Sequence, residues 1–128
     1  LGLPFGERKK TYNSRMAQEL CKLEEHNGYG ERFHTAVFKA YFVNGLNIAL
    51  DSTLLKLGNS VGLSRADIKD TLENRSYKEA VDKDWNRSFL MGVTAVPTFV
   101  INGMSIVGAQ PYEKLVQLVK TGGAKQRV

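Results

Sequence analysis

Cysteine is almost absent from this sequence of 128 residues. Cys21 is the single cysteine, so the chain can form neither an internal disulfide nor a Cys-x-x-Cys redox pair. A cysteine-based zinc site is also excluded, and His26 and His34 lack the spacing of a metal-ligand pair. We therefore expect no metal, no cofactor and no catalytic residue within these residues.

Long hydrophobic runs are missing as well. No apolar stretch approaches the ~18 residues that a membrane-spanning helix needs, so a membrane partner is not expected. The N-terminus shows no charged segment followed by an apolar one, so no signal peptide is visible. A cytoplasmic location is the expectation, but it does not follow from this absence. Residues 1–6 do not begin with methionine and are typical of mid-chain sequence.

A dense stripe of one charge is the third absence. The formal charge is +5 and the pI is about 9.4, but acidic residues alternate with basic ones through most of the chain. Basic residues cluster only at 8–10 and, more loosely, over 120–127. A nucleic-acid surface usually combines a basic stripe with aromatic residues, so a nucleic-acid partner is not expected. The hydrophobic fraction of 42% is that of an ordinary globular protein.

Amphipathic helices dominate the first two thirds of the chain. Asp51 is the predicted N-cap of one helix, and Ser64 with Asp67 and Ser76 with Glu79 resemble capping boxes at the start of two others. Apolar residues recur at helical spacing after each cap. The predicted helices cover residues 13–26, 31–43 and 52–61, and two more begin at residues 64 and 76.

A β-hairpin is predicted after these helices. Two short β-branched and apolar runs, at 98–101 and 104–107, flank Asn102-Gly103, the strongest sequence signal of a tight hairpin. A last helix begins near Pro111, with Leu115, Leu118 and Val119 facing inward, and residues 122–128 are predicted to be a disordered tail. The fold class is mainly α with a small β-hairpin (α+β).

The hairpin strands do not alternate between apolar and polar residues. Continuous apolar strands are usually covered on both faces, and an isolated hairpin is marginally stable in water. We therefore expect an incomplete sheet that needs further strands. They would come from a segment preceding this chain, from a second copy in a homodimer, or from a strand swap.

Pro97 stands where a loop enters the first of these strands. The run Gly-Val-Thr-Ala-Val-Pro-Thr-Phe at 92–99 leads from a helix-ending glycine into the strand. Proline is tolerated at the first position of a strand, and a cis X–Pro bond there makes a tight turn.

This loop, the hairpin and the run Gly-Ala-Gln-Pro at 108–111 together resemble the DsbA family of thioredoxin-fold thiol:disulfide oxidoreductases. The FrnE-like branch of disulfide isomerases is the most similar, because residues 1–5, 12–14 and 38–42 also match it. The resemblance implies a helical insertion domain over 1–91 and the C-terminal part of a thioredoxin-like fold over 92–121.

The same resemblance implies a substrate-binding loop without its catalytic pair. Val96 would contact a substrate peptide, Pro97 would be the cis-proline, and Thr98 would begin the strand. The family's Cys-x-x-Cys pair would lie outside this chain, and its partners would be protein or small-molecule thiols and disulfides. This chain alone would be inactive.

Two other functions remain open. The first is a glutathione-dependent enzyme resembling kappa-class transferases and hydroxychromene-carboxylate isomerases, and the second is a non-catalytic binding fragment. Cys21 is interpreted as a packed core residue, and Tyr77 and Trp85 as core or interface residues.

Overall fold

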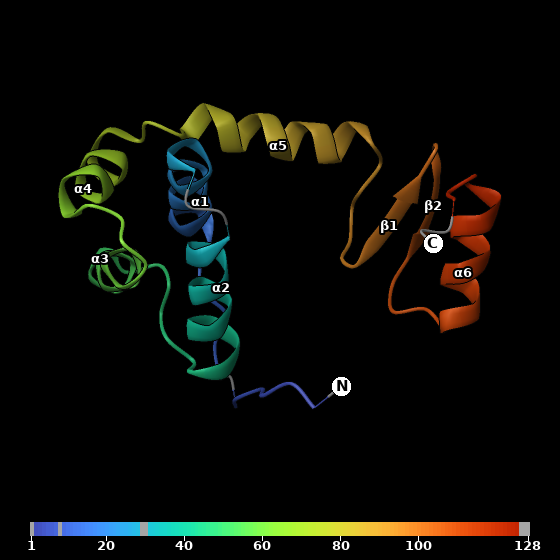
Figure 1. Cartoon of the computed structure of the whole chain (residues 1–128), viewed down its shortest axis with the longest axis horizontal. Helices are drawn as coiled ribbons and strands as arrows, with labels where there is room; N and C mark the ends of the chain where they lie inside the picture. The colour runs from blue at the N-terminus through green and yellow to red at the C-terminus, as the bar shows by residue number, and fades with distance from the viewer. Residues whose placement is uncertain (1, 8, 29–30, 126–128) are drawn as a thin grey trace. The chain divides into compact units, whose positions relative to one another are not determined.

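The computed structural model describes residues 2–7, 9–28 and 31–125, which form several helices and one small β-hairpin (Figure 1). The elements are α1 (Arg15–Asn27), α2 (Arg32–Phe38), the π-helical turn η1 (Lys39–Val43), α3 (Asp51–Ser60), α4 (Arg65–Asn74), α5 (Lys78–Leu90), β1 (Thr98–Ile101), β2 (Met104–Val107) and α6 (Tyr112–Thr121). The mainly helical α+β class is therefore confirmed.

The chain forms two compact units, Leu1–Asp84 and Trp85–Val128, and the division falls within α5. A division into compact units does not identify a helical insertion domain, so the assignment of residues 1–91 to such a domain stays a prediction. None of the described helices combines the length and the hydropathy needed to cross a membrane.

A hydrophobic core holds the helical unit together. Helix α1 packs against α2 and α4, and α3 packs against the same two helices. The periodicity of the sequence located most of this core correctly. Its fully buried apolar side chains include Leu20, Phe33, Leu54 and Ile68, and Cys21 is buried among them as expected. Tyr77 packs against this core, whereas Trp85 is 53% exposed within its unit.

Two of the predicted caps have different outcomes. Ser64 is the N-cap of α4, and its hydroxyl accepts the N–H of Asp67 at 3.0 Å, as predicted. Asp51 is not an N-cap, because it is already the first helical residue of α3. Leu50 holds the cap position without a side-chain hydrogen bond, and the Asp51 carboxylate instead lies in the first turn, where negative charge is favourable.

The capping box predicted at Ser76 is wrong. Arg75 ends α4 in the left-handed conformation, with φ of 54°, and its carbonyl accepts the N–H of Lys78 at 2.9 Å. This turn delays the start of α5 to Lys78. The Ser76 hydroxyl therefore bonds to the Asp70 carboxylate rather than capping α5.

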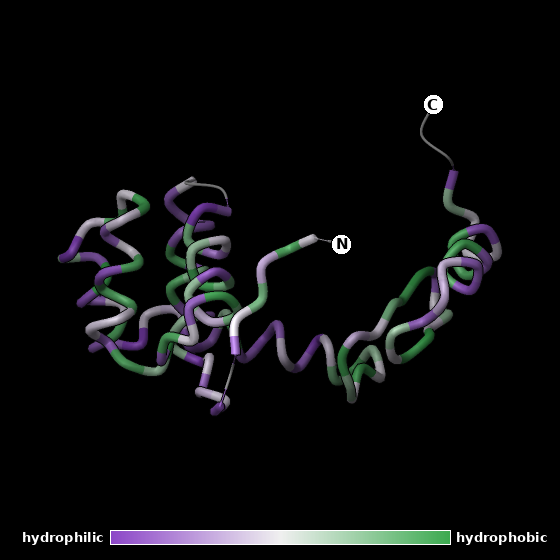
Figure 2. Tube along the Cα trace, turned by 90° about the horizontal axis from the view of Figure 1, so that it is seen from below, coloured by the Kyte–Doolittle hydropathy of each residue, from purple (hydrophilic) through white to green (hydrophobic). Residues whose placement is uncertain are grey.

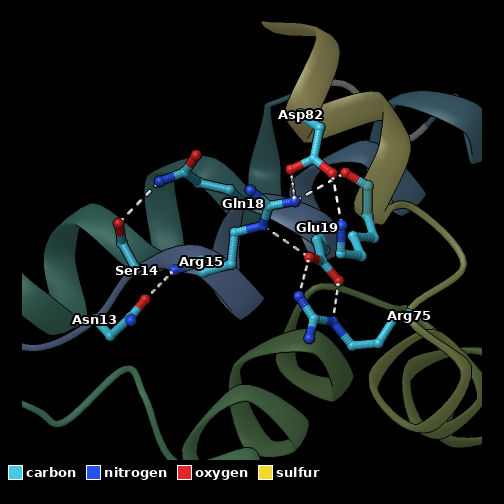
Figure 3. Close-up of polar contacts among 8 residues, drawn as sticks. Asn13, Ser14, Arg15, Gln18, Glu19, Arg75 and Asp82 are labelled. Atoms are coloured by element: carbon cyan, nitrogen blue, oxygen red, sulfur yellow. Dashed lines mark hydrogen bonds and ion pairs between the residues drawn. The ribbon is translucent and has the colours of Figure 1, made fainter. Parts of the chain in front are cut away.

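Glu19 of α1 is completely buried, although sequence reasoning gave it no role. Arg75 donates two hydrogen bonds to its carboxylate, at 2.7 and 2.9 Å, and Arg15 donates a third at 2.8 Å (Figure 3). Arg15 also binds the carboxylate of Asp82 at 2.6 Å, which ties α5 to α1. The bonds from Arg75 and Arg15 lower the pKa of Glu19 despite its burial.

Glu24 is a second buried acid of α1. Its carboxylate accepts the N–H of Phe33, and the N–H of His34 at 3.3 Å. Both N–H groups belong to the first turn of α2, where no intrahelical acceptor exists. A side chain from one helix therefore caps the next helix.

The second unit consists of the hairpin and α6. Asn102 and Gly103 have φ of 45° and 77°, as a type I′ turn requires, and Ile101 pairs with Met104. The predicted hairpin is confirmed at its predicted boundaries. Figure 2 shows hydrophobic colour along much of both strands. The sheet in the described residues has two strands, and the further strands stay a prediction.

The end of α6 corrects the predicted disordered tail. The N–H groups of Gly123 and Ala124 bond to Lys120 and Val119, which is the pattern of a Schellman cap. Gly122 is buried, so residues 122–124 are part of the folded unit, while 126–128 lie outside the described residues.

Two details of α6 also differ from prediction. Pro111 is the N-cap and not the first helical residue. Leu115 and Leu118 are half-buried as expected, but Val119 is 45% exposed, because the helix turns it away from the hairpin.

Candidate functional site

The loop at 93–97 joins α5 to β1 (Figure 1). Gly92 follows the end of α5 with φ of 75°, a backbone conformation in which a residue with a side chain would be strained. The N–H groups of Gly92 and Val93 bond to the carbonyls of Phe89 and Ser88, at 2.9 and 3.0 Å. This cap turns the chain sharply, so the loop leaves the helix in one defined direction.

The loop presents Val96 to solvent beside a cis-proline. The Val96–Pro97 peptide bond is cis, as the resemblance implied, and the Val96 side chain is 89% exposed. Strand pairing begins one residue later, at Thr98 opposite Val107. Val96 and Pro97 therefore end the loop and Thr98 begins β1, and the roles of all three toward a substrate stay predictions.

Two hydrogen bonds fix the loop backbone from either side of Pro97. The Thr98 hydroxyl donates to the carbonyl oxygen of Ala95 at 2.6 Å. The N–H of Gly108 donates to the carbonyl oxygen of Pro97 at 2.8 Å. Thr98 is thus more than the first strand residue, because its side chain closes the turn that carries Val96.

Gln110 fixes the neighbouring segment. Its side-chain amide donates to the carbonyl oxygen of Val107, the last residue of β2, at 2.7 Å. Sequence analysis missed this role, although a glutamine just before a helix N-terminus is a side chain able to reach back to the preceding strand.

The backbone of Val96 is available for pairing. Across the part of the chain that the structure describes, neither its N–H nor its carbonyl bonds to another backbone group. A rigid, exposed segment with one unpaired donor and one unpaired acceptor can add an extended peptide by strand pairing. The neighbouring loop side chains at 93–95 are small and uncharged.

Thiol chemistry is not available from Cys21. The side chain is buried in the helical unit, and burial raises the pKa of its thiol to about 12, with the nearby Glu24 adding to the shift. A thiol of this kind is not a nucleophile near neutral pH. In the described residues there is also no group of three or more metal-ligating side chains.

The chain as a whole matches a known family. A family model, the DSBA-like thioredoxin domain, matches residues 1–120, and the chain therefore belongs to this family. The chain is also similar to the crystal structure of a probable DsbA oxidoreductase from Streptomyces coelicolor, with a TM-score of 0.81. That similarity covers 99% of this chain and 56% of the other at 24% identity, so it shows the fold alone.

Two curated relatives are similar in sequence. The uncharacterized protein YwbO of Bacillus subtilis is 37% identical over 81 residues, which cover 62% of this chain and 40% of YwbO. The ClpXP adapter protein SpxH of Halalkalibacterium halodurans is 25% identical over 117 residues, covering 86% of this chain and 38% of SpxH. The matches thus span about two fifths of each curated relative. The FrnE-like branch stays a prediction.

Proposed function

We propose that this chain is part of a thiol:disulfide oxidoreductase or isomerase of the DsbA family and supplies its substrate-facing cis-proline loop. The observation that carries the proposal is the exposed, unpaired backbone of Val96 next to a cis-proline. The bonds made by Thr98 and Gly108 hold this segment ready for a peptide that carries a thiol or a disulfide.

The redox step itself needs a cysteine pair outside this chain. A thiolate of that pair would attack one sulfur of a substrate disulfide, form a mixed disulfide, and release the other substrate sulfur as a thiolate. The second cysteine would then resolve the mixed disulfide. In this scheme, Val96 would hold the substrate backbone while the sulfur atoms exchange.

A non-catalytic binding protein is the second candidate. The name of one relative, SpxH, describes an adapter protein, and adapters bind partners without chemistry. An exposed pairing segment serves that function equally well. The glutathione-dependent alternative differs from the oxidoreductase in the residue that replaces the attacking cysteine.

The first test is the intact mass of the protein as purified, with sequencing of any residues that precede this chain. A Cys-x-x-Cys pair in that segment is the expected result. A serine in place of the attacking cysteine would favour the glutathione-dependent enzyme, and a mass equal to this chain would reject catalysis by the protein.

The second test measures insulin reduction by the whole protein with dithiothreitol. Val96→Asp places a charge at the proposed contact and should raise KM at least tenfold with little change in kcat. Val119→Asp, on the exposed side of α6, is the matched control and should retain normal kinetics. Equal KM values for the two variants would contradict the proposed contact.

A further inference from the structure

The helical unit contains a cavity that the proposed function does not use. It lies between α1 and the continuous helix formed by α2 and η1, and has a volume of about 330 Å³. Small-molecule sites typically have volumes of roughly 300–1,000 Å³, with mostly apolar walls and a few polar groups. This cavity has that composition, and all of its walls come from one compact unit.

Aromatic rings form much of the cavity wall. Tyr12 contacts Tyr41 edge-on, with ring centres 6.5 Å apart, and Tyr41 contacts Phe42 at 4.8 Å. Phe38 lies 6.0 Å from Phe42 and 5.7 Å from the ring of His34. Phe38 is 56% exposed, so part of the aromatic wall is open to solvent. Such a wall offers both ring faces and ring edges to a flat ligand.

The π-helical turn accounts for this density of rings. The N–H of Asn44 bonds to the carbonyl of Lys39, five residues earlier, at 3.1 Å. The wider turn rotates each residue by less than an α-helix does, and the consecutive residues Tyr41 and Phe42 both line the cavity. Single π-helical turns inside α-helices are rare and are often found at functional sites.

Polar groups at the cavity are available to a ligand. Within the described residues, no hydrogen bond reaches the hydroxyl of Tyr12 or the imidazole of His34, and both side chains are half-buried. The amide of Gln18 lines the same space, where it donates a hydrogen bond to the Ser14 hydroxyl at 2.8 Å. The cavity walls include no Asp, Glu, Lys or Arg, so a charged ligand would lose hydration without gaining a counter-charge.

From these features we propose that the cavity binds a neutral, planar aromatic molecule carrying a hydroxyl or carbonyl group. The rings of Tyr12, Phe38, Tyr41 and Phe42 hold its aromatic faces, and His34 hydrogen-bonds its polar group. All residues of this site belong to the helical unit.

The test is binding of 6-fluoro-2-naphthol to the purified protein, followed by ¹⁹F NMR. Saturable broadening with a Kd on the order of 0.1–1 mM is expected for a ligand of this size. The anionic 6-fluoro-2-naphthoate should bind at least tenfold more weakly. No saturable binding of the naphthol, or equal binding of the anion, would overturn the proposal.

Two variants locate the binding. Ala17→Leu fills the cavity from α1 and should weaken binding at least tenfold. His34→Phe preserves a ring but removes the hydrogen-bonding nitrogens; it should weaken naphthol binding about fivefold and leave 2-fluoronaphthalene unaffected. His26→Phe is the matched control, since His26 lies outside the cavity wall. Naphthol affinity that is unchanged in His34→Phe, or reduced equally in His26→Phe, would refute the assignment even if Ala17→Leu did not fold.

Discussion

The contact between Gly122 and Ile101 offers a sharp test of how α6 is fixed to the hairpin. Gly122 has φ of −71°, which any residue adopts, so an alanine there is free of backbone strain. A Cβ atom at this position would lie 2.6 Å from Cγ2 and 2.8 Å from Cγ1 of Ile101. Carbon atoms in contact are usually about 3.5–4.0 Å apart, so Gly122→Ala must displace the helix end or the Ile101 side chain.

The expected cost is the difference between two effects. Inserting a methyl group into a packed contact costs about 1–3 kcal/mol. Replacing glycine by alanine also restricts the unfolded chain, which stabilises the folded protein by about 0.4–1 kcal/mol. Gly122→Ala should therefore destabilise the unit by about 1–2 kcal/mol. Gly123→Ala should cost a comparable ~1–2 kcal/mol for a different reason, since its φ of 75° disfavours a side chain and no atom lies within 4 Å.

A double-mutant cycle with Ile101→Ala separates the two causes. Ile101→Ala removes all three atoms that meet the new Cβ, so Gly122→Ala should become neutral in that background, while the cost of Gly123→Ala should not change. The measurements are urea unfolding and hydrogen exchange of the β1 and β2 amides. The steric explanation fails if Gly122→Ala costs the same with and without the Ile101 side chain.

Three further predictions concern the helical unit. Glu24→Gln should lower the free energy of unfolding by about 1 kcal/mol, seen in urea melts, because a neutral amide caps the α2 N-terminus less well. The bonds from Arg75 and Arg15 lower the pKa of Glu19 in the folded protein, so the unfolded chain takes up this proton first as the pH falls. The stabilisation by ionised Glu19 should therefore be present above the ordinary pKa of a glutamate and be lost as the pH falls through the folded pKa. Urea midpoints measured against pH should show this loss in the original protein and not in Glu19→Gln. The pKa of about 12 for Cys21 predicts no labelling by iodoacetamide at pH 8 until urea unfolds the chain; rapid labelling of the folded protein would contradict its burial.

Much of the local structure could be predicted because it depends on neighbouring residues. Asn102-Gly103 forms its turn through backbone conformations that these two residues favour, so the hairpin boundaries were predicted correctly. Ser64 caps α4 through a hydroxyl that reaches only three residues ahead. The start of α5 was missed because a turn at Arg75 outweighed the local capping preference of Ser76.

The candidate loop was located by its motif, and its geometry came from the fold. The sequence singled out Val96, Pro97 and Thr98, but it did not reveal that Gly108, on the far side of the hairpin, holds the Pro97 carbonyl. Such a bond forms only after the two strands have paired, so it cannot be predicted from the spacing of the residues along the chain.

The sequence by itself determined the hairpin position, the approximate positions of most helices, the lack of a redox pair, and the family resemblance. Tertiary structure alone decided which distant groups meet. Glu19 is buried with Arg75, which is 56 residues away, and Glu24 of α1 caps α2. Local preferences act over a few residues, whereas the burial of a charge and the walls of a cavity depend on how the completed helices pack against one another.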